Sequence, residues 1–378
     1  MSVTVALVTP YYPPKIGGVE RYVAQLAQGL AADPDSEFTP VVITTRSGGK
    51  RTTVAVEDGV RVIRLGVWLR VSNTPLSPLW PIQLRRWLRR TGAEIVNAHA
   101  PVPGLGDLAV FAAGRRPTVL TYHAGTMHKG VAGSGLADRL IAWYERLVLP
   151  RVFERCDVPV PVGPSSMAAS RPGAELITPG VDVGRFTPGP AGGKRGLVFV
   201  GRMDRSSAWK GVDVLVEALT HLADLPDATL TLVGEGDALA DHLDLAQRLG
   251  VRERVEATGA LAGDELVTAI RSAAVLVLPS TTDAECAGTV TMEAMACATP
   301  VVASNVGSLA YVVGDGEGGL IVPPADAVAL AAACRRVLTD RELAARLGEA
   351  GRGRAEKLFA WPHLVERYRA LFTRVLER

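Results

Sequence analysis

The chain has 378 residues, of which 48% are hydrophobic and 21% are charged, an ordinary globular composition that excludes disordered and collagen-like chains. Its formal net charge of +2 is too small to indicate nucleic acid as a partner, although residues 1–190 carry +7 and residues 191–378 carry −5. The four cysteines show no CxxC spacing and are too few for a disulfide framework, so we expect a reduced compartment.

Short apolar runs alternate with amphipathic segments in the first half of the chain. The runs predict strands at 3–8, 39–44, 60–65, 94–97 and 118–122, and apolar residues at helical spacing predict helices at 20–31, 79–90 and 135–153. Strands that are apolar throughout are typical of a parallel sheet covered on both faces. We therefore expect a Rossmann-like, acceptor-binding domain over residues 1–190.

A segment rich in proline and glycine, 187–194, predicts a linker, after which the alternation starts again. Strands are expected at 196–200, 229–233, 255–258, 274–278, 301–303 and 319–322, with helices at 211–222, 238–249, 263–272, 289–298 and from 326 onward. These elements predict a second doubly wound domain over 191–359. We expect Pro362 to kink the final segment, and helix 360–378 to pack back on the first domain. The expected fold is α/β, with two Rossmann-like domains facing each other across a cleft at the carboxyl ends of their strands.

The segment 279–304 (PSTTDAECAGTVTMEAMACATPVVAS) holds the most informative residues. Gly288 precedes a helix whose first N–H groups and positive dipole end are suited to an anionic group such as phosphate. Glu285 lies in the loop before this helix, and Glu293 lies about one turn inside it, so both carboxylates can accept hydrogen bonds from one ligand. The alternative is that the two are solvated surface acids.

An acidic residue, a gap of seven residues, E-A-M-A and the strand T-P-V-V together resemble the signature of glycosyltransferase family 4, retaining nucleotide-sugar transferases of GT-B architecture. Further segments match in order along almost the whole chain: Gly17-Gly18-Val19-Glu20, Pro179-Gly180-Val181-Asp182, Phe199-Val200-Gly201-Arg202, Trp209-Lys210-Gly211, Val233-Gly234-Glu235-Gly236 and Phe359-Ala360-Trp361.

The resemblance implies roles for the residues that would hold the donor. Arg202 and Lys210 would neutralise the diphosphate, a task for which a planar guanidinium and a compact ammonium are suited. Glu293 would hold the ribose hydroxyls, and Glu285 would hold the donor sugar and phosphate together with the backbone N–H groups of Gly288, Thr289 and Val290. An exposed helix-start lysine is the alternative reading of Lys210.

Glycines after strands are expected to line the nucleotide. Gly17 and Gly18 allow the backbone to approach a phosphate closely, although a plain loop pair is the alternative. Gly234 begins a GxG that does not continue as a dinucleotide fingerprint, because Leu239 stands where the third small residue is required. We therefore exclude NAD and interpret Gly234 as lining the nucleotide pocket, with Leu261 as a backbone contact to the base.

A histidine near the reaction centre is the remaining catalytic candidate. The resemblance implies that His123, at the end of strand 118–122, reaches the donor sugar, so His123, Glu285, Arg202 and Lys210 form the expected catalytic set. His99 ends the preceding strand and is the rival, and His128 lies on the loop beyond. A lone histidine is more often structural.

The sequence contains no cluster of His, Asp, Glu or Cys residues at metal-ligand spacing. The resemblance implies a metal-independent enzyme with no cofactor besides the nucleotide sugar. Two positions depart from the family, which usually has an aromatic residue at 287 and a glycine at 298 where this chain has Ala287 and Ala298. Ala287 would leave a roomier wall beside the donor sugar.

Residues 79–90 (LWPIQLRRWLRR) predict a basic, tryptophan-bearing amphipathic helix of the kind that lies on anionic membranes. The alternative, which we favour, is a helix with a core face and a solvated arginine face. No apolar run approaches the roughly 18–20 residues needed to cross a bilayer, and residues 1–10 lack the basic start of a signal peptide. We expect a cytoplasmic protein, with peripheral membrane contact through 79–90 left open.

The sequence therefore predicts a retaining glycosyltransferase that moves a sugar from a nucleotide-diphosphate sugar, with UDP- and GDP-sugars favoured, to a glycan, lipid-linked or small-molecule hydroxyl. The alternatives are a GT-B nucleotide-sugar epimerase and a non-catalytic nucleotide-sugar-binding protein. The oligomeric state, the sugar and the linkage are not encoded in any readable motif.

Overall fold

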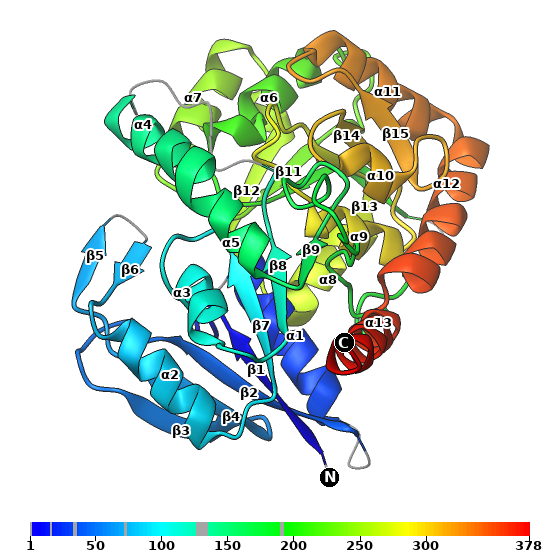
Figure 1. Ribbon diagram of the computed structural model, residues 1–378. Helices are drawn as coiled ribbons and strands as arrows, with labels where there is room; N and C mark the ends of the chain where they lie inside the picture. The colour runs from blue at the N-terminus through cyan, green and yellow to red at the C-terminus, as the bar shows by residue number, and fades with distance from the viewer. Residues whose placement is uncertain (1, 16, 33–35, 72–73, 126–134, 190–192) are drawn as a thin grey trace. The chain divides into compact units, whose positions relative to one another are not determined.

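The computed structural model describes residues 2–15, 17–32, 36–71, 74–125, 135–189 and 193–378 (Figure 1). The chain divides into two compact units. Of the described residues, those within 2–125, 135–179 and 361–378 form unit 1, and residues 180–189 and 193–360 form unit 2.

Unit 1 is built on a seven-stranded sheet in the order β3-β4-β2-β1-β7-β8-β9. All neighbouring strands are parallel except β3 and β4. The strands are β1 (Val3–Val8), β2 (Phe38–Thr45), β3 (Thr53–Glu57), β4 (Val60–Leu65), β7 (Ile95–Ala100), β8 (Thr118–Tyr122) and β9 (Val158–Pro161), and a separate hairpin pairs β5 (Leu69–Val71) with β6 (Thr74–Leu76).

The helices of unit 1 connect and cover these strands. They are α1 (Gly18–Ala31), α2 (Trp80–Arg90), α3 (Leu105–Ala112), α4 (Gly135–Trp143), a π-helical turn η1 (Tyr144–Val148), α5 (Leu149–Arg155) and α13 (Trp361–Leu376). The C-terminal helix α13, red in Figure 1, packs against α1, where Tyr22 meets Tyr368 edge to face. The kink expected at Pro362 is wrong: this proline lies in the first turn of α13, where it costs no helical hydrogen bond, and the chain instead bends at Ala360, which is extended.

Unit 2 is built on a six-stranded, fully parallel sheet in the order β12-β11-β10-β13-β14-β15. Its strands are β10 (Arg195–Val200), β11 (Leu230–Val233), β12 (Val255–Gly259), β13 (Ala273–Leu278), β14 (Val301–Ser304) and β15 (Gly319–Val322). Its helical segments are η2 (Arg205–Lys210), α6 (Val212–Thr220), α7 (Leu239–Arg248), η3 (Arg252–Arg254), α8 (Gly263–Ser272), α9 (Thr289–Ala296), α10 (Leu309–Val313), α11 (Ala327–Thr339), α12 (Arg341–Arg354) and η4 (Ala355–Phe359).

The chain passes from unit 1 to unit 2 between residues 179 and 180, before the segment 187–194 in which the sequence places the linker. The N–H of Val181 donates to the carbonyl of Phe359 at 2.8 Å, and the side chain of Phe186 is buried in the core of unit 2. Residues 190–192 of that segment lie outside the described residues. Among the described helices, none is both long enough and apolar enough to cross a membrane.

Candidate active site

The loop that carries Lys210 is fastened to the loop that follows β13. Gly211 adopts a φ of +69°, and a Cβ placed on it would lie 2.1 Å from the carbonyl oxygen of Pro279, so only glycine fits. The backbone N–H and the hydroxyl of Thr281 both donate to the carbonyl of Trp209, at 2.7 and 3.1 Å. Lys210 therefore stands on a fixed segment.

Lys210 and Glu285, which are 75 positions apart in the chain, form an ion pair. Nζ of Lys210 lies 3.1 Å from Oε2 of Glu285, and the two side chains are only 18% and 10% exposed. The hydroxyl of Ser280 donates to the same carboxylate oxygen at 3.2 Å, and Nζ also lies 4.6 Å from the centroid of the Trp209 ring. The sequence predicts both charged residues as site residues. Trp209 belongs to one of the matching segments but was assigned no role, and no motif indicates Ser280.

The loop that carries Glu285 is held from its other side by the turn after β14. A Cβ on Gly307 would lie 1.7 Å from the carbonyl oxygen of Glu285. The N–H of Gly307 donates to Asp283 at 2.7 Å, and the N–H of Ser308 donates to the carbonyl of Cys286 at 3.0 Å. Glu285 therefore sits on backbone packed between two loops.

Helix α9 begins at the end of this loop, as the sequence predicts. Gly288 has a φ of +54°, and a Cβ there would lie 2.5 Å from Leu309 and 2.8 Å from Leu278. Thr289 and Val290, in the first turn, are half-buried, and the first N–H groups of a helix have no acceptor within it. Glu293, in the second turn, is buried.

Arg202 forms an ion pair of its own, with Asp204. Its side chain is 70% exposed, and its guanidinium lies 3.7 Å from the carboxylate of Asp204. An exposed ion pair of this length is weak, so Arg202 is available to change partner when an anion binds.

Gly234 allows the loops that follow β10 and β11 to run against each other. It has a φ of +138°, and a Cβ on it would lie 2.0 Å from the carbonyl oxygen of Gly201. Its N–H donates to the carbonyl of Gly259 at 2.8 Å. Glycine is therefore required at position 234 because the chain's own backbone packs closely there, whether or not a nucleotide is bound. Leu261, on the next loop, is half-buried against the core.

In unit 1, a carboxylate covers the first of the two expected phosphate-binding glycines. A Cβ on Gly17 would lie 2.3 Å from Oε2 of Glu20, whose side chain is buried at the first turn of α1, whereas a Cβ on Gly18 would meet nothing within 4 Å. From the sequence we expected no role for Glu20 beyond its place in the matching segment, although an acid in the first turn of a helix complements the helix dipole.

His123 and its rival His99 lie together at the carboxyl ends of β8 and β7. Nδ1 of His99 lies 2.9 Å from Nε2 of His123, and the rings are nearly parallel, with centroids 5.2 Å apart. The rings of Tyr22 and His123 pack nearly perpendicular to each other, with their centroids 4.8 Å apart. Burial lowers the pKa of His123 to about 3 and lowers the pKa of His99 well below its ordinary value, so both rings are neutral at neutral pH. His128 lies outside the described residues.

A chain of hydrogen bonds supports the strands that carry the two histidines. The hydroxyls of Tyr22 and Tyr368 are 2.8 Å apart, and that of Tyr368 is 2.9 Å from the hydroxyl of Thr121. The amide of Asn97 donates to the same Thr121 hydroxyl at 3.0 Å. The network ties β7 and β8 to helices α1 and α13, and no sequence motif indicates it.

Comparison with known proteins places the chain in a family. A family model described as "Glycosyl transferases group 1" matches residues 184–354, and one described as "Glycosyltransferase Family 4" matches residues 16–185. Over 381 residues the chain is 30% identical to the GDP-mannose-dependent alpha-(1-6)-phosphatidylinositol monomannoside mannosyltransferase of Mycolicibacterium smegmatis, with 94% of each chain covered. The chain belongs to glycosyltransferase family 4.

Two further relatives of this glycosyltransferase are informative. It is 31% identical over 365 residues to the phosphatidyl-myo-inositol mannosyltransferase of the same species, covering 90% of this chain and 86% of that one. Sucrose-phosphate synthase from Thermosynechococcus elongatus, 25% identical, superposes with a TM-score of 0.79 over 99% of both chains. These likenesses confirm the expected GT-B fold and glycosyltransferase activity.

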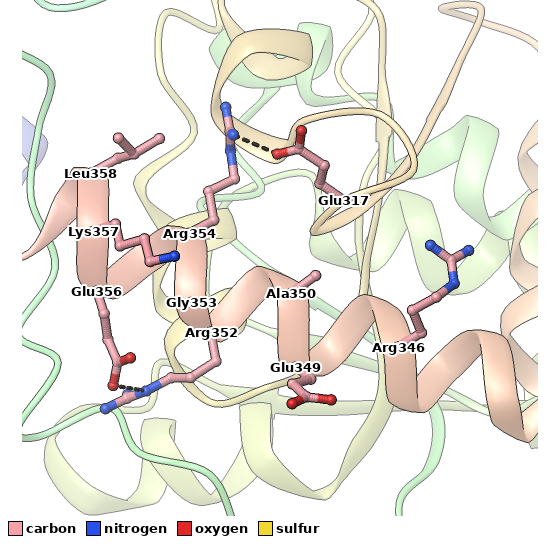
Figure 2. A pocket seen from close by; sticks show the side chains of 10 residues that line it. All are labelled: Glu317, Arg346, Glu349, Ala350, Arg352, Gly353, Arg354, Glu356, Lys357 and Leu358. Atoms are coloured by element: carbon pink, nitrogen blue, oxygen red, sulfur yellow. Dashed lines mark hydrogen bonds and ion pairs between the residues drawn. The ribbon is translucent and has the colours of Figure 1, made fainter.

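One surface hollow of this glycosyltransferase is lined by none of the predicted site residues. It has a volume of about 760 Å³ and is shown in Figure 2, where Glu317, Arg346, Glu349, Ala350, Arg352, Gly353, Arg354, Glu356, Lys357 and Leu358 line it. Arg352 donates to the carbonyls of Phe186 and Ala296 at 2.7 and 2.6 Å, and Arg354 pairs with Glu317 at 2.6 Å (Figure 2). These arginines hold the end of α12 against other segments of unit 2. Within the described ranges, no three metal-binding side chains cluster.

Proposed function

We propose that this glycosyltransferase transfers a hexosyl group from a nucleotide-diphosphate sugar to a hydroxyl of a lipid-linked or glycan acceptor, with retention of the anomeric configuration. The observation that carries the proposal is the shielded Lys210–Glu285 pair, held on the loop that leads into α9. A fixed cation and helix N–H groups are suited to a departing diphosphate, whose negative charge grows as the glycosidic bond breaks.

We propose that different residues of unit 2 bind different parts of the donor. Lys210 and Arg202 donate N–H groups to the diphosphate oxygens, with the first N–H groups of α9 from Gly288 onward. The carboxylate of Glu293 accepts hydrogen bonds from the ribose hydroxyls, and Glu285 orients both Lys210 and the sugar. Gly234 and Leu261 border the nucleotide.

The candidate residues constrain how the glycosidic bond can be broken and re-formed. None of them is an evident nucleophile, so we propose that the acceptor hydroxyl attacks from the face that the diphosphate leaves, and that a phosphate oxygen receives its proton. Because Lys210 and Arg202 supply the positive charge, we propose that the reaction needs no divalent metal, and turnover should persist in excess EDTA.

The names of the relatives support GDP-mannose as the first donor to test and a phosphoinositide-type lipid as the first acceptor. The proposal is tested with a panel of UDP-, GDP-, ADP- and dTDP-sugars, scored by thermal shift, donor hydrolysis and transfer. One nucleotide should raise the melting temperature of the wild type and of Glu349→Ala, a control acid in the exposed hollow, but not that of Glu293→Ala. No shift with any nucleotide would contradict the proposal. The anomeric signal of the product, followed by NMR, tests retention.

Helix α2 supports a peripheral membrane contact. Its core face consists of Trp80, Leu84 and Leu88, which are buried; of the two residues expected there, Leu84 is buried and Trp87 is half-buried. On the opposite side, Ile82 is 69% exposed, and the spacing of 3 and 4 residues places it in line with two exposed arginines, Arg86 and Arg89.

An apolar side chain flanked by cations is suited to an anionic lipid surface. Arg86→Gln/Arg89→Gln should weaken sedimentation with phosphatidylglycerol vesicles but leave binding of the nucleotide unchanged. The matched control, Arg248→Gln/Arg341→Gln, removes two exposed arginines of unit 2. Equal binding of both variants to the vesicles would contradict a role for α2.

A further inference from the structure

In the hydrogen bond between His99 and His123, either ring could be the donor. His99 is fully buried at the end of β7, and its Nδ1 lies 2.9 Å from Nε2 of His123. Two neutral imidazoles share one hydrogen bond only if one ring carries its proton on the shared side and the other does not. The choice fixes which nitrogen of His123 carries its own proton.

The far nitrogen of His99 decides between the two arrangements. Nε2 of His99 is buried and has no hydrogen-bond partner in the part of the chain that the structure describes. If His123 donated, His99 would carry its proton on Nε2, which would leave a buried N–H without an acceptor. If His99 donates through Nδ1, only a lone pair is left unpartnered, and orphaned acceptors are tolerated more often than orphaned N–H groups. The geometry therefore favours His99 as the donor.

The consequence for His123 is a fixed tautomer. With Nε2 accepting from His99, the ring must carry its proton on Nδ1. The side chain is half-buried, and among the described residues Nδ1 of His123 has no hydrogen-bond partner. Tyr22 packs nearly perpendicular to this ring, with the ring centroids 4.8 Å apart, which restricts its rotation. Since burial holds the ring neutral, Nδ1–H is a permanent, uncharged donor.

We propose that His99 is a positioning residue for sugar transfer: it donates Nδ1–H to Nε2 of His123 and thereby presents the Nδ1–H of His123 to a hydroxyl oxygen of the sugar substrate. The inference rests on the proposed function for the identity of the substrate, but not for the tautomer. A neutral donor recognises a neutral sugar hydroxyl and does not compete with Lys210 and Arg202 for the diphosphate.

Two variants separate hydrogen bonding from packing. In His99→Asn, the side-chain amide nitrogen takes the place of Nδ1 and can still donate, whereas His99→Leu fills similar space with no donor. The control His242→Asn alters another buried histidine, which hydrogen-bonds to Asp213 on unit 2, outside the proposed site. Removing a group that orients a metal-bound histidine typically costs about 10–100-fold in activity, and we expect a loss of the same order when the partner of His123 is removed.

The first readout is nitrogen NMR of the full chain with its six histidines labelled, in which His123→Gln identifies the His123 signals. We expect the proton of His123 on Nδ1 in the wild type and in His99→Asn, and a mixture of tautomers in His99→Leu. The proton of His123 on Nε2 in the wild type would overturn the proposal. This readout needs no substrate, so it stands even if no nucleotide sugar binds and the proposed function fails.

The second readout is turnover. We expect His99→Leu to lose about 10–100-fold in kcat, while the thermal shift produced by the nucleotide alone, whose contacts lie on unit 2, stays at the wild-type value. His99→Asn should recover most of the lost turnover, and His242→Asn should be unaffected. If His99→Asn, folded by melting temperature, is as slow as His99→Leu, the role of His99 is packing alone and the proposal is wrong.

Discussion

Lys210→Ala is expected to impair both stability and turnover, and a second substitution should restore only the stability. In the wild type the Glu285 side chain is 10% exposed, and the change leaves Ser280 as the donor to its carboxylate among the described residues. Removing one partner of a buried pair is costly because the other charge stays buried without compensation. Lys210→Ala/Glu285→Gln removes that charge as well but cannot replace the cation at the diphosphate.

The magnitude follows from the geometry. At the observed separation of 3.1 Å and an effective dielectric constant of about 20, the attraction between the two charges is about 5 kcal/mol. The desolvation of both groups and the residual exposure of Lys210 reduce the net loss to about 2–3 kcal/mol. For a unit of this size, that corresponds to a fall in melting temperature of roughly 4–12 °C. Losing a preorganised cation at the leaving group should lower kcat by about 10²–10³-fold.

Two assays on the wild type, Lys210→Ala, Glu285→Gln and the double variant test this reasoning: thermal unfolding without ligand, and kcat for transfer. The double variant should melt several degrees above Lys210→Ala yet turn over no faster. If the melting temperatures of the two single variants add, the ion pair contributes nothing to stability. If Lys210→Ala retains wild-type turnover, the phosphate-binding role of Lys210 is refuted.

Three further predictions concern single residues. Ala298 has a φ of +50°, a strained conformation for alanine, so Ala298→Gly should raise the free energy of unfolding by about 0.5–1 kcal/mol in urea titrations, despite the larger entropy of glycine in the unfolded chain. Gly211→Ala should destabilise unit 2 and slow turnover because its Cβ would clash with Pro279, whereas Gly250→Ala, with a similar φ of +72° and nothing within 4 Å, should show only the smaller backbone cost in melting temperature. The pKa of His123 is lowered to about 3 in the fold, so between pH 6.5 and 3 the unfolded chain binds more protons there and stability falls as the pH falls. Relative to His123→Gln, the wild type should therefore lose up to about 1.4 kcal/mol per pH unit in this range, measured by urea unfolding at several pH values.

The sequence predicted most strands of the two sheets because these strands are continuous apolar runs bounded by glycine, proline or charge. Two strands at the edges of the unit 1 sheet were missed for opposite reasons. Strand β9 has prolines at 159 and 161, which an edge strand tolerates because its outer side needs no ladder hydrogen bonds. Strand β3 is largely exposed and is held by its antiparallel partner β4 rather than by burial.

Single site residues were readable from the sequence, but their partners were not. Lys210 and Glu285 were each predicted from local motifs, yet 75 positions separate them and no pattern in either segment specifies the other. His99 and His123 were treated as rivals because the order of their strands in the sheet was unknown. In the structure, β7 and β8 are neighbours and the two rings pair. The departure at Ala298 also acquires a physical meaning, since its positive φ is the conformation that favours the family's glycine.

The balance of charge at unit 2 shows why a second cation is needed there. Before a donor binds, the charge of Lys210 is already matched by Glu285 at 3.1 Å, so this pair alone offers a diphosphate no net attraction. The missing positive charge has to come from groups that are not yet committed, and the site supplies two: the first N–H groups of α9 and the guanidinium of Arg202, 70% exposed and only weakly paired with Asp204. Glu285 thus keeps Lys210 in place, while Arg202 and the helix attract the anion.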